Sequence, residues 1–126
     1  MISGIDLNEV MDFVSENDKD ETKTTFKISP ISSRIQARIG ALIGSGGAGA
    51  LEGMLESFKF GVKGIINLID KKGNPVHVEL ESYSVGAERY SVVPEKVLAM
   101  LPLSIISEVG AKVISISQLS EGERKN

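Results

Sequence analysis

Three groups of residues have types and spacings that could support chemistry, and the first is a glycine motif. Gly44, Gly46 and Gly49 have the Gly-x-Gly-x-x-Gly spacing with which a loop approaches a pyrophosphate at a helix N-terminus. A dinucleotide site would also need a strand at Ile39–Ile43, directly before the motif, and Asp70 after a second strand to bind the ribose. The residues before the motif have helical spacing instead, and the rest of the chain cannot supply the other parallel strands. We therefore expect a flexible loop between two helices, with nucleotide binding as a distant alternative.

The second and third groups are acidic side chains that could bind a metal ion. His77, Glu79 and Glu81 alternate along one face of an expected strand, but the chain has a single histidine and no cysteine to form a second cluster of ligands. Asp18–Glu21 resembles a calcium loop only superficially, because it lacks the glycine and the twelfth-position glutamate of that motif. We expect a solvated strand face and a charged loop over residues 15–23, with no metal and no cofactor.

Catalytic and nucleic-acid-binding arrangements are not indicated. Ser45 lacks the Gly-x-Ser-x-Gly context of a nucleophile, because residue 43 is isoleucine, and one histidine makes a catalytic triad improbable. Arg34 and Arg38 are four residues apart, but the net charge is −3, so we assign them with Lys59 and Lys63 to the solvated sides of their helices. The chain is therefore expected to bind other proteins, and to be neither an enzyme nor a nucleic-acid-binding or membrane protein.

Length and composition are those of one small globular domain. The chain has 126 residues, of which 41% are hydrophobic and 25% are charged, enough for a single core over residues 1–126. No apolar run is long enough to span a membrane, and the first residues lack the basic and apolar regions of a signal peptide. We expect a cytosolic protein.

Hydrophobic spacing and capping signals predict most of the elements. Ser33 and Gln36 have capping-box spacing for a helix that ends near Gly44. The other predicted elements are a helix over Asp6–Val14, a strand over Thr22–Ser29, a turn at Asp70–Pro75, a strand over 76–81, an irregular segment at Ser84–Ser91, a helix from Pro94 to Met100 and a helix that begins at Pro102. We expect residues 120–126 to form a polar tail.

Two apolar stripes are candidate interaction surfaces. Beyond the glycine-rich loop at 44–50, apolar residues recur at heptad-like spacing and predict one helix of about twenty residues that self-associates, with Gly61 and Gly64 at a bend or a close contact. That stripe consists of Leu51, Leu55, Phe58, Val62, Ile65 and Ile69. In the last helix the stripe is Leu103, Ile106, Val109, Val113 and Ile116; we assign its first half to the core and Val113–Ile116 to a partner. The alternative is that both stripes only close the domain's own core.

Several segments between Thr24 and Asn126 carry a resemblance to a known family. A strand and a proline-marked helix precede the segment Gly61–Val76, then Leu101-Pro102-Leu103 opens a helix and the chain closes with Ser117–Asn126. These segments are similar to small bacteriophage proteins encoded among the tail genes, above all to tail assembly chaperones, which coat the tape-measure protein while the tail tube is built. Ile65 stands where that family often has a tryptophan.

Composition, spacing and resemblance together predict an α+β domain of two or three short strands packed by four or five helices. The resemblance implies a tail assembly protein that acts through protein–protein contacts in the host cytoplasm, with the tape-measure protein as partner. The alternative that it also implies is a virion component of the tail or the head–tail junction. The residues expected at the protein interface are Leu51, Leu55, Phe58, Val62, Val113 and Ile116.

Overall fold

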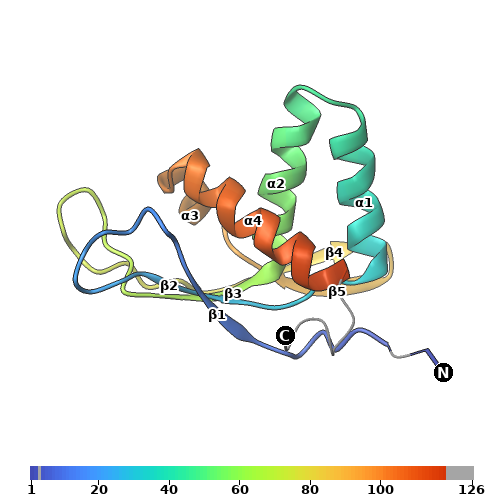
Figure 1. Ribbon diagram of the computed structural model, residues 1–126, viewed down its shortest axis with the longest axis horizontal. Coiled ribbons are helices and arrows are strands. Elements are labelled where there is room, and N and C mark those ends of the chain that lie inside the picture. Colours follow the sequence, from blue (N-terminus) through green and yellow to red (C-terminus); the bar gives the residue numbers. More distant parts are fainter. Residues whose placement is uncertain (3, 119–126) are drawn as a thin grey trace.

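The structure, a computed structural model, describes residues 1–2 and 4–118 (Figure 1). It is a small α+β domain with two antiparallel sheets, one of the order β1-β2-β3 and one formed by β4 and β5. The described elements are β1 (Met11–Val14), β2 (Thr25–Ile28), α1 (Ser33–Gly44), α2 (Ala48–Gly61), β3 (Val62–Ile66), β4 (Glu81–Val85), β5 (Glu88–Val92), α3 (Glu95–Met100) and α4 (Leu103–Gln118). The expected fold class is confirmed with four helices, but the described residues contain five strands rather than two or three. None of the helices in this part of the chain is long and apolar enough to cross a membrane.

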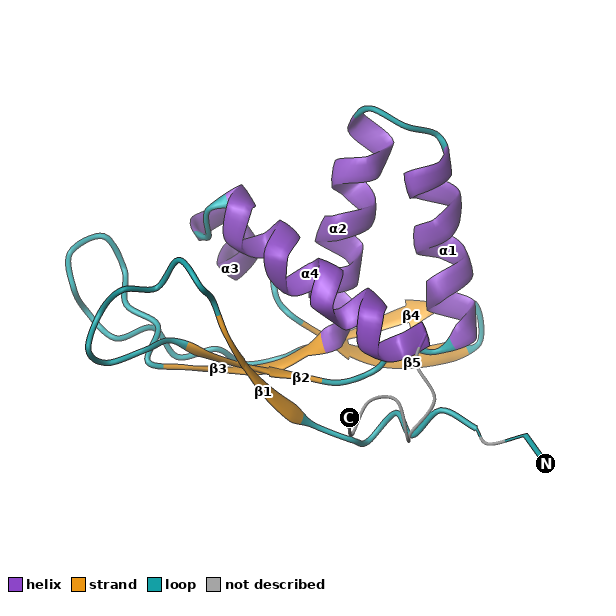
Figure 2. Ribbon diagram, viewed as in Figure 1, coloured by secondary structure: helices purple, strands orange, loops and turns teal. Residues whose placement is uncertain are grey.

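The helices lie on one side of the sheets, as Figure 2 shows, and this arrangement gives the three-stranded sheet a buried face and an open face. Phe26 of β2 pairs with Phe13 of β1 and with Ile65 of β3, and this row faces the core. On the opposite face Thr25 pairs with Val14 and with Ile66, whose side chain is 45% exposed. The outer face therefore carries a small apolar row that none of the described helices covers.

Helices α1 and α2 form a hairpin around the glycine motif. The Ser32 hydroxyl caps α1 by accepting the Ile35 N–H at 3.4 Å, one residue earlier than the cap predicted from Ser33. Gly46 and Gly47 have φ angles of 70° and 53°, which glycine adopts without steric cost, so the chain reverses direction between two helices (top of Figure 1). Residues 39–43 belong to α1, which removes the strand that the dinucleotide alternative required.

The predicted helix of about twenty residues is wrong beyond Gly61, because the chain passes directly from α2 into β3. A β-bulge explains why the apolar residues of this strand have a helix-like spacing. Val62 pairs with Ile28 and Ile65 pairs with Phe26, so three residue steps on β3 match two on β2. Val62 and Ile65 therefore share the buried face at a spacing of three, which imitates one turn of a helix.

Two further segments differ from their predicted structures. The helix predicted over Asp6–Val14 is a turn followed by β1; the Asp6 carboxylate accepts the Asn8 N–H at 3.0 Å, and Met11 and Phe13 then alternate toward the core. The segment predicted to be irregular at 84–91 contributes to the β4–β5 hairpin, with Gly86 at φ 61° in a two-residue turn. In both cases the strands are short, and cross-strand pairing decides their conformation.

Of the remaining predictions, the turn at 70–75 and the starts of the last two helices are confirmed, and the strand over 76–81 is not. Residues 70–75 form a turn with Gly73 at φ 85°, and Pro94 caps α3 while Pro102 directly precedes α4. The strand predicted over 76–81 is wrong for residues 76–80: their side chains alternate between half-buried and exposed, but in the described part of the chain their backbone pairs with no strand, and β4 begins only at Glu81.

Candidate functional site

The structure separates the six predicted interface residues into two groups. Leu51 is 47% exposed and Leu55 is half-buried, so both are accessible on α2. The other four are buried in the core of the chain itself, which corrects their assignment to a surface: Phe58, Val62, Val113 and Ile116. The division proposed for α4 is wrong for its second half: Ile106 and Val109 are buried as predicted, but Val113 and Ile116 are equally buried, and only Leu103 at the start of the stripe is exposed, at 46%. The physical reason is that the C-terminal half of α4 packs on α2 at Gly61, where a Cβ would lie 2.3 Å from Val113.

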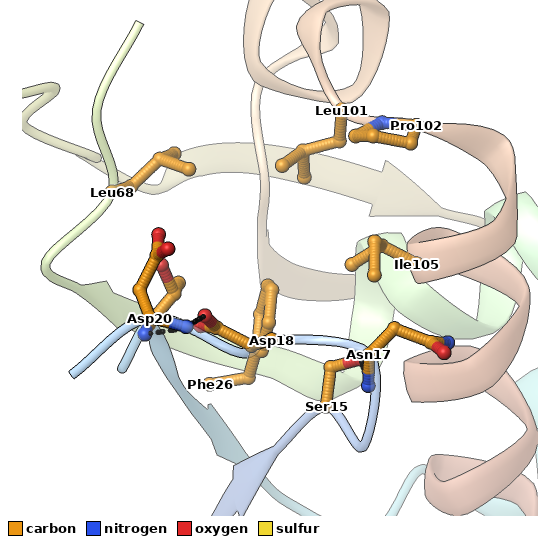
Figure 3. Close-up of a pocket in the computed structure, with 10 residues that line it drawn as sticks. Ser15, Asn17, Asp18, Asp20, Phe26, Leu68, Leu101, Pro102 and Ile105 are labelled. Atoms are coloured by element: carbon orange, nitrogen blue, oxygen red, sulfur yellow. Dashed lines mark hydrogen bonds between the residues drawn. The ribbon is translucent and has the colours of Figure 1, made fainter. Parts of the chain in front are cut away.

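A cavity of about 230 Å³ lies between the β1–β2 loop and the corner that joins α3 to α4 (Figure 3). In Figure 3, Leu101 and Ile105 point from the helical corner toward the loop, and Leu68 closes another side. The complete lining consists of Ser15, Asn17, Asp18, Asp20, Thr24, Phe26, Leu68, Leu101, Pro102 and Ile105. One wall is therefore apolar and the other is polar and acidic.

Asp18 closes the β1–β2 loop on itself. Its carboxylate accepts the Thr24 N–H at 2.8 Å and the Asp20 N–H at 3.2 Å, and its main-chain oxygen accepts a hydrogen bond from the Lys23 ammonium group. The bond from Thr24 holds the pKa of the Asp18 carboxyl below its ordinary value; burial opposes this shift, and the Asp20 N–H and the Lys23 charge lower the pKa by smaller amounts. Asp18 is therefore ionised at neutral pH and fixes the shape of the loop.

The same loop is attached to α4 and to Asn67, the residue that follows β3. The Ser15 hydroxyl donates to the Glu108 carboxylate at 2.5 Å, and the Glu16 N–H donates to its second oxygen at 3.2 Å. At the other end of the loop, the Thr24 hydroxyl donates to the main-chain oxygen of Asn67 at 2.9 Å. These bonds connect the polar wall to both neighbouring elements, so the cavity is formed before any ligand binds.

Asp20 is the polar residue best placed to meet a ligand. Its side chain rises from the loop toward Leu68 in Figure 3. Among the residues that the structure describes, no hydrogen bond or ion pair engages its carboxylate. The lining contains two aspartates and no lysine or arginine, so its electrostatic potential favours a cation over an anion.

The cavity is too small and its lining too simple for a bound cofactor. Small-molecule sites usually have volumes of about 300–1,000 Å³, which is more than this cavity offers. No group of three or more His, Cys, Asp or Glu side chains in the described residues could hold a metal ion. His77 and Glu79, which sequence analysis considered, are highly exposed and 3.7 Å apart. The cavity therefore combines a small volume with one apolar and one acidic wall.

A second polar cluster joins α1, α2 and the β4–β5 hairpin, and no sequence pattern predicted it. The Arg38 guanidinium donates to Glu56 at 2.8 Å and to the Tyr83 hydroxyl at 3.4 Å, and these bonds raise its pKa. The Lys59 ammonium lies 3.8 Å from the centre of the Tyr83 ring. Burial lowers the pKa of Lys63, which donates to two main-chain oxygens. These three cations are therefore packing groups rather than the freely solvated side chains predicted from spacing.

Comparisons with known protein families, curated proteins and solved structures found no match to this chain.

Proposed function

We propose that this chain is a protein-binding component of bacteriophage tail assembly, and that it holds a segment of its partner at the cavity between the β1–β2 loop and the α3–α4 corner. The observation that carries the proposal is this cavity, whose apolar wall faces a loop tied in place at both ends. A preformed site avoids part of the entropy loss of ordering a loop on binding.

Exposed apolar residues directly before or after lining residues in the chain support a protein as the ligand. Met100 and Leu103 flank Leu101 and Pro102 in the chain, and Ile69 follows Leu68; all three flanking side chains are exposed. Protein interfaces combine such an apolar centre with a polar rim, here supplied by the charged loop.

The assignment to tail assembly comes from the resemblance, and two of its segments meet at the cavity. Leu68 belongs to the segment Gly61–Val76, and Leu101-Pro102-Leu103 forms the opposite wall. The closing segment from Ser117 lies mostly outside the described residues. The tape-measure protein is the partner that we propose, and the host cytoplasm is the place of action.

Self-association belongs to the proposal as well. It was predicted from the apolar stripe that begins at Leu51, and the helix that carries this stripe ends at Gly61. Of that stripe, Leu51 and Leu55 on α2 remain accessible. Light scattering after size exclusion, with Leu51→Ala as the variant, measures whether this short apolar surface joins two copies.

The test of the function is capture of a defined partner. The tagged chain is co-expressed with the tape-measure protein of the same phage, and Leu101→Asp is compared with Ile66→Asp, which places the same charge on the open sheet face. We expect the wild type and Ile66→Asp to capture the tape-measure protein. Leu101→Asp should lose this capture, while its circular dichroism spectrum shows an unchanged fold. If only Ile66→Asp lost capture, the interface would lie on the open sheet face instead of at the cavity. If the wild type captured no tape-measure protein, the proposed function would be contradicted.

Mass spectrometry of purified virions separates the two roles that the resemblance implies. A chaperone leaves the particle after the tail is built, so we expect the chain in infected cells and not in virions. Many copies per virion would instead identify a structural component.

A further inference from the structure

We infer that the cavity recognises a composite feature of its partner: one apolar side chain that enters the cavity, with a lysine or arginine beside it that pairs with Asp20. This inference adds the recognition chemistry to the proposed function. It rests on that function in one respect, that the cavity is the protein-binding site. It specifies the chemistry of the partner segment rather than its identity.

The apolar part of the inference follows from the size and the walls of the cavity. A volume of about 230 Å³ bounded by Leu68, Leu101 and Ile105 over the ring of Phe26 suits a single aliphatic or aromatic side chain. Phe26 is buried and pairs with both neighbouring strands, so the floor of the cavity does not move aside for a larger group.

The cationic part follows from the difference between the two aspartates. Both oxygens of Asp18 are engaged by main-chain N–H groups of its own loop. Asp20 uses only its N–H in that network, so its carboxylate keeps its capacity to accept hydrogen bonds. Because Asp20 rises beside Leu68 (Figure 3), a cation paired with it would lie next to the apolar side chain in the cavity.

The surrounding charges favour the same partner. Residues 15–24 contain four acidic side chains and two lysines, an excess of two negative charges. Lys23 is turned toward the main-chain oxygen of Asp18, so it does not neutralise Asp20 directly. An acidic segment would be repelled here, which gives the site a means of rejecting wrong partners.

The experiment uses the full chain, labelled with ¹⁵N, and three synthetic helical peptides that differ at one position. Each carries a leucine, and four residues later, on the same helix face, a lysine, a glutamine or a glutamate. We expect affinity in the order lysine, glutamine, glutamate, with steps of about two- to fivefold, as for exposed ion pairs. The amide shifts should map to the loop and the α3–α4 corner, and replacing the leucine by alanine should abolish binding.

Two matched protein variants test the role of Asp20. Asp20→Asn should bind the lysine and glutamine peptides equally, while Glu21→Gln, which removes the neighbouring charge outside the cavity lining, should keep the preference for lysine. Equal binding of all three peptides by the wild type, a lysine preference that survives Asp20→Asn, or no binding of any peptide would each overturn the inference.

The inference and the proposed function can fail separately. Capture of the tape-measure protein that depends on Leu101 but not on Asp20 would keep the function and overturn the composite recognition. The expected peptide order without any capture of a tail protein would keep the recognition chemistry and overturn its assignment to tail assembly.

Discussion

Ser57 on α2 donates its hydroxyl hydrogen to the main-chain oxygen of Gly110 on α4 across 2.6 Å, inside the core. The two helices come this close because both carry small residues where they cross; a Cβ at Gly110 would lie 2.7 Å from the main-chain oxygen of Met54. Along α2, small residues recur at every fourth position, at Gly49, Gly53, Ser57 and Gly61. The first two face α1 and the last two face α4, so this one stripe packs α2 between its two neighbours.

Gly110→Ala should destabilise the domain by about 1–3 kcal/mol, because the new methyl group has to displace the backbone of α2. The control is Gly40→Ala in α1, where a Cβ would meet nothing within 4 Å. That change should stabilise the domain by up to about 1 kcal/mol, since alanine is the better helix former. Urea unfolding of both variants gives the two free energies, and a loss of stability in Gly40→Ala as large as in Gly110→Ala would contradict the proposed close crossing.

Two buried serines should respond in opposite ways to replacement by alanine. Ser57→Ala removes the bond to Gly110 and should cost about 1 kcal/mol. Ser29 is also buried, but its hydroxyl has no hydrogen-bond partner within residues 1–2 and 4–118, so Ser29→Ala should be neutral or stabilising. Thermal melts of both variants at one pH make the comparison; a destabilised Ser29→Ala would mean that this hydroxyl has a partner in solution.

Helices could be predicted from the sequence more reliably than strands, and the reason lies in what each element depends on. The α1 helix has a local cap and local apolar spacing, both visible in the sequence. The β3 strand has an apolar spacing that a bulge makes helix-like, and only its partner β2 determines the register. The same holds for β1 and for the β4–β5 hairpin, whose short strands are defined by pairing.

The cavity could be predicted only in fragments. The charged loop over 15–23 and the Leu101-Pro102-Leu103 corner were each recognised in the sequence, but about eighty residues separate them. The bonds from Ser15 and Glu16 to Glu108 connect the loop to α4, and no local sequence pattern predicts such long-range bonds. The predicted interface failed for a related reason: an apolar stripe on a helix looks the same whether it meets the chain's own core or a partner.

The shape of the β1–β2 loop should depend on pH through Asp18. Its pKa in the folded chain lies below the ordinary value of 3.8, so the carboxylate contributes stability that is present above pH 3.8 and lost as the pH falls through the folded pKa. The difference in melting temperature between the wild type and Asp18→Asn should therefore be largest well above this value and shrink at lower pH. A difference that stays constant to the acid end of the series would show that the charge of Asp18 is not what closes the loop.

The C-terminal half of α4 should prove as important for stability as its centre. Ile106 and Ile116 are both 2% exposed, whereas Leu103, one turn before Ile106, is 46% exposed. Replacing a buried isoleucine by alanine removes apolar contacts and leaves a cavity, at a cost of about 2–5 kcal/mol. Ile106→Ala and Ile116→Ala should therefore lose similar amounts of stability, while Leu103→Ala should change it by no more than about 0.5 kcal/mol. Chemical unfolding of the three variants under one condition gives the comparison. If Ile116→Ala were as well tolerated as Leu103→Ala, the end of α4 would not belong to the core, and its apolar side chains would again be candidates for contact with a partner.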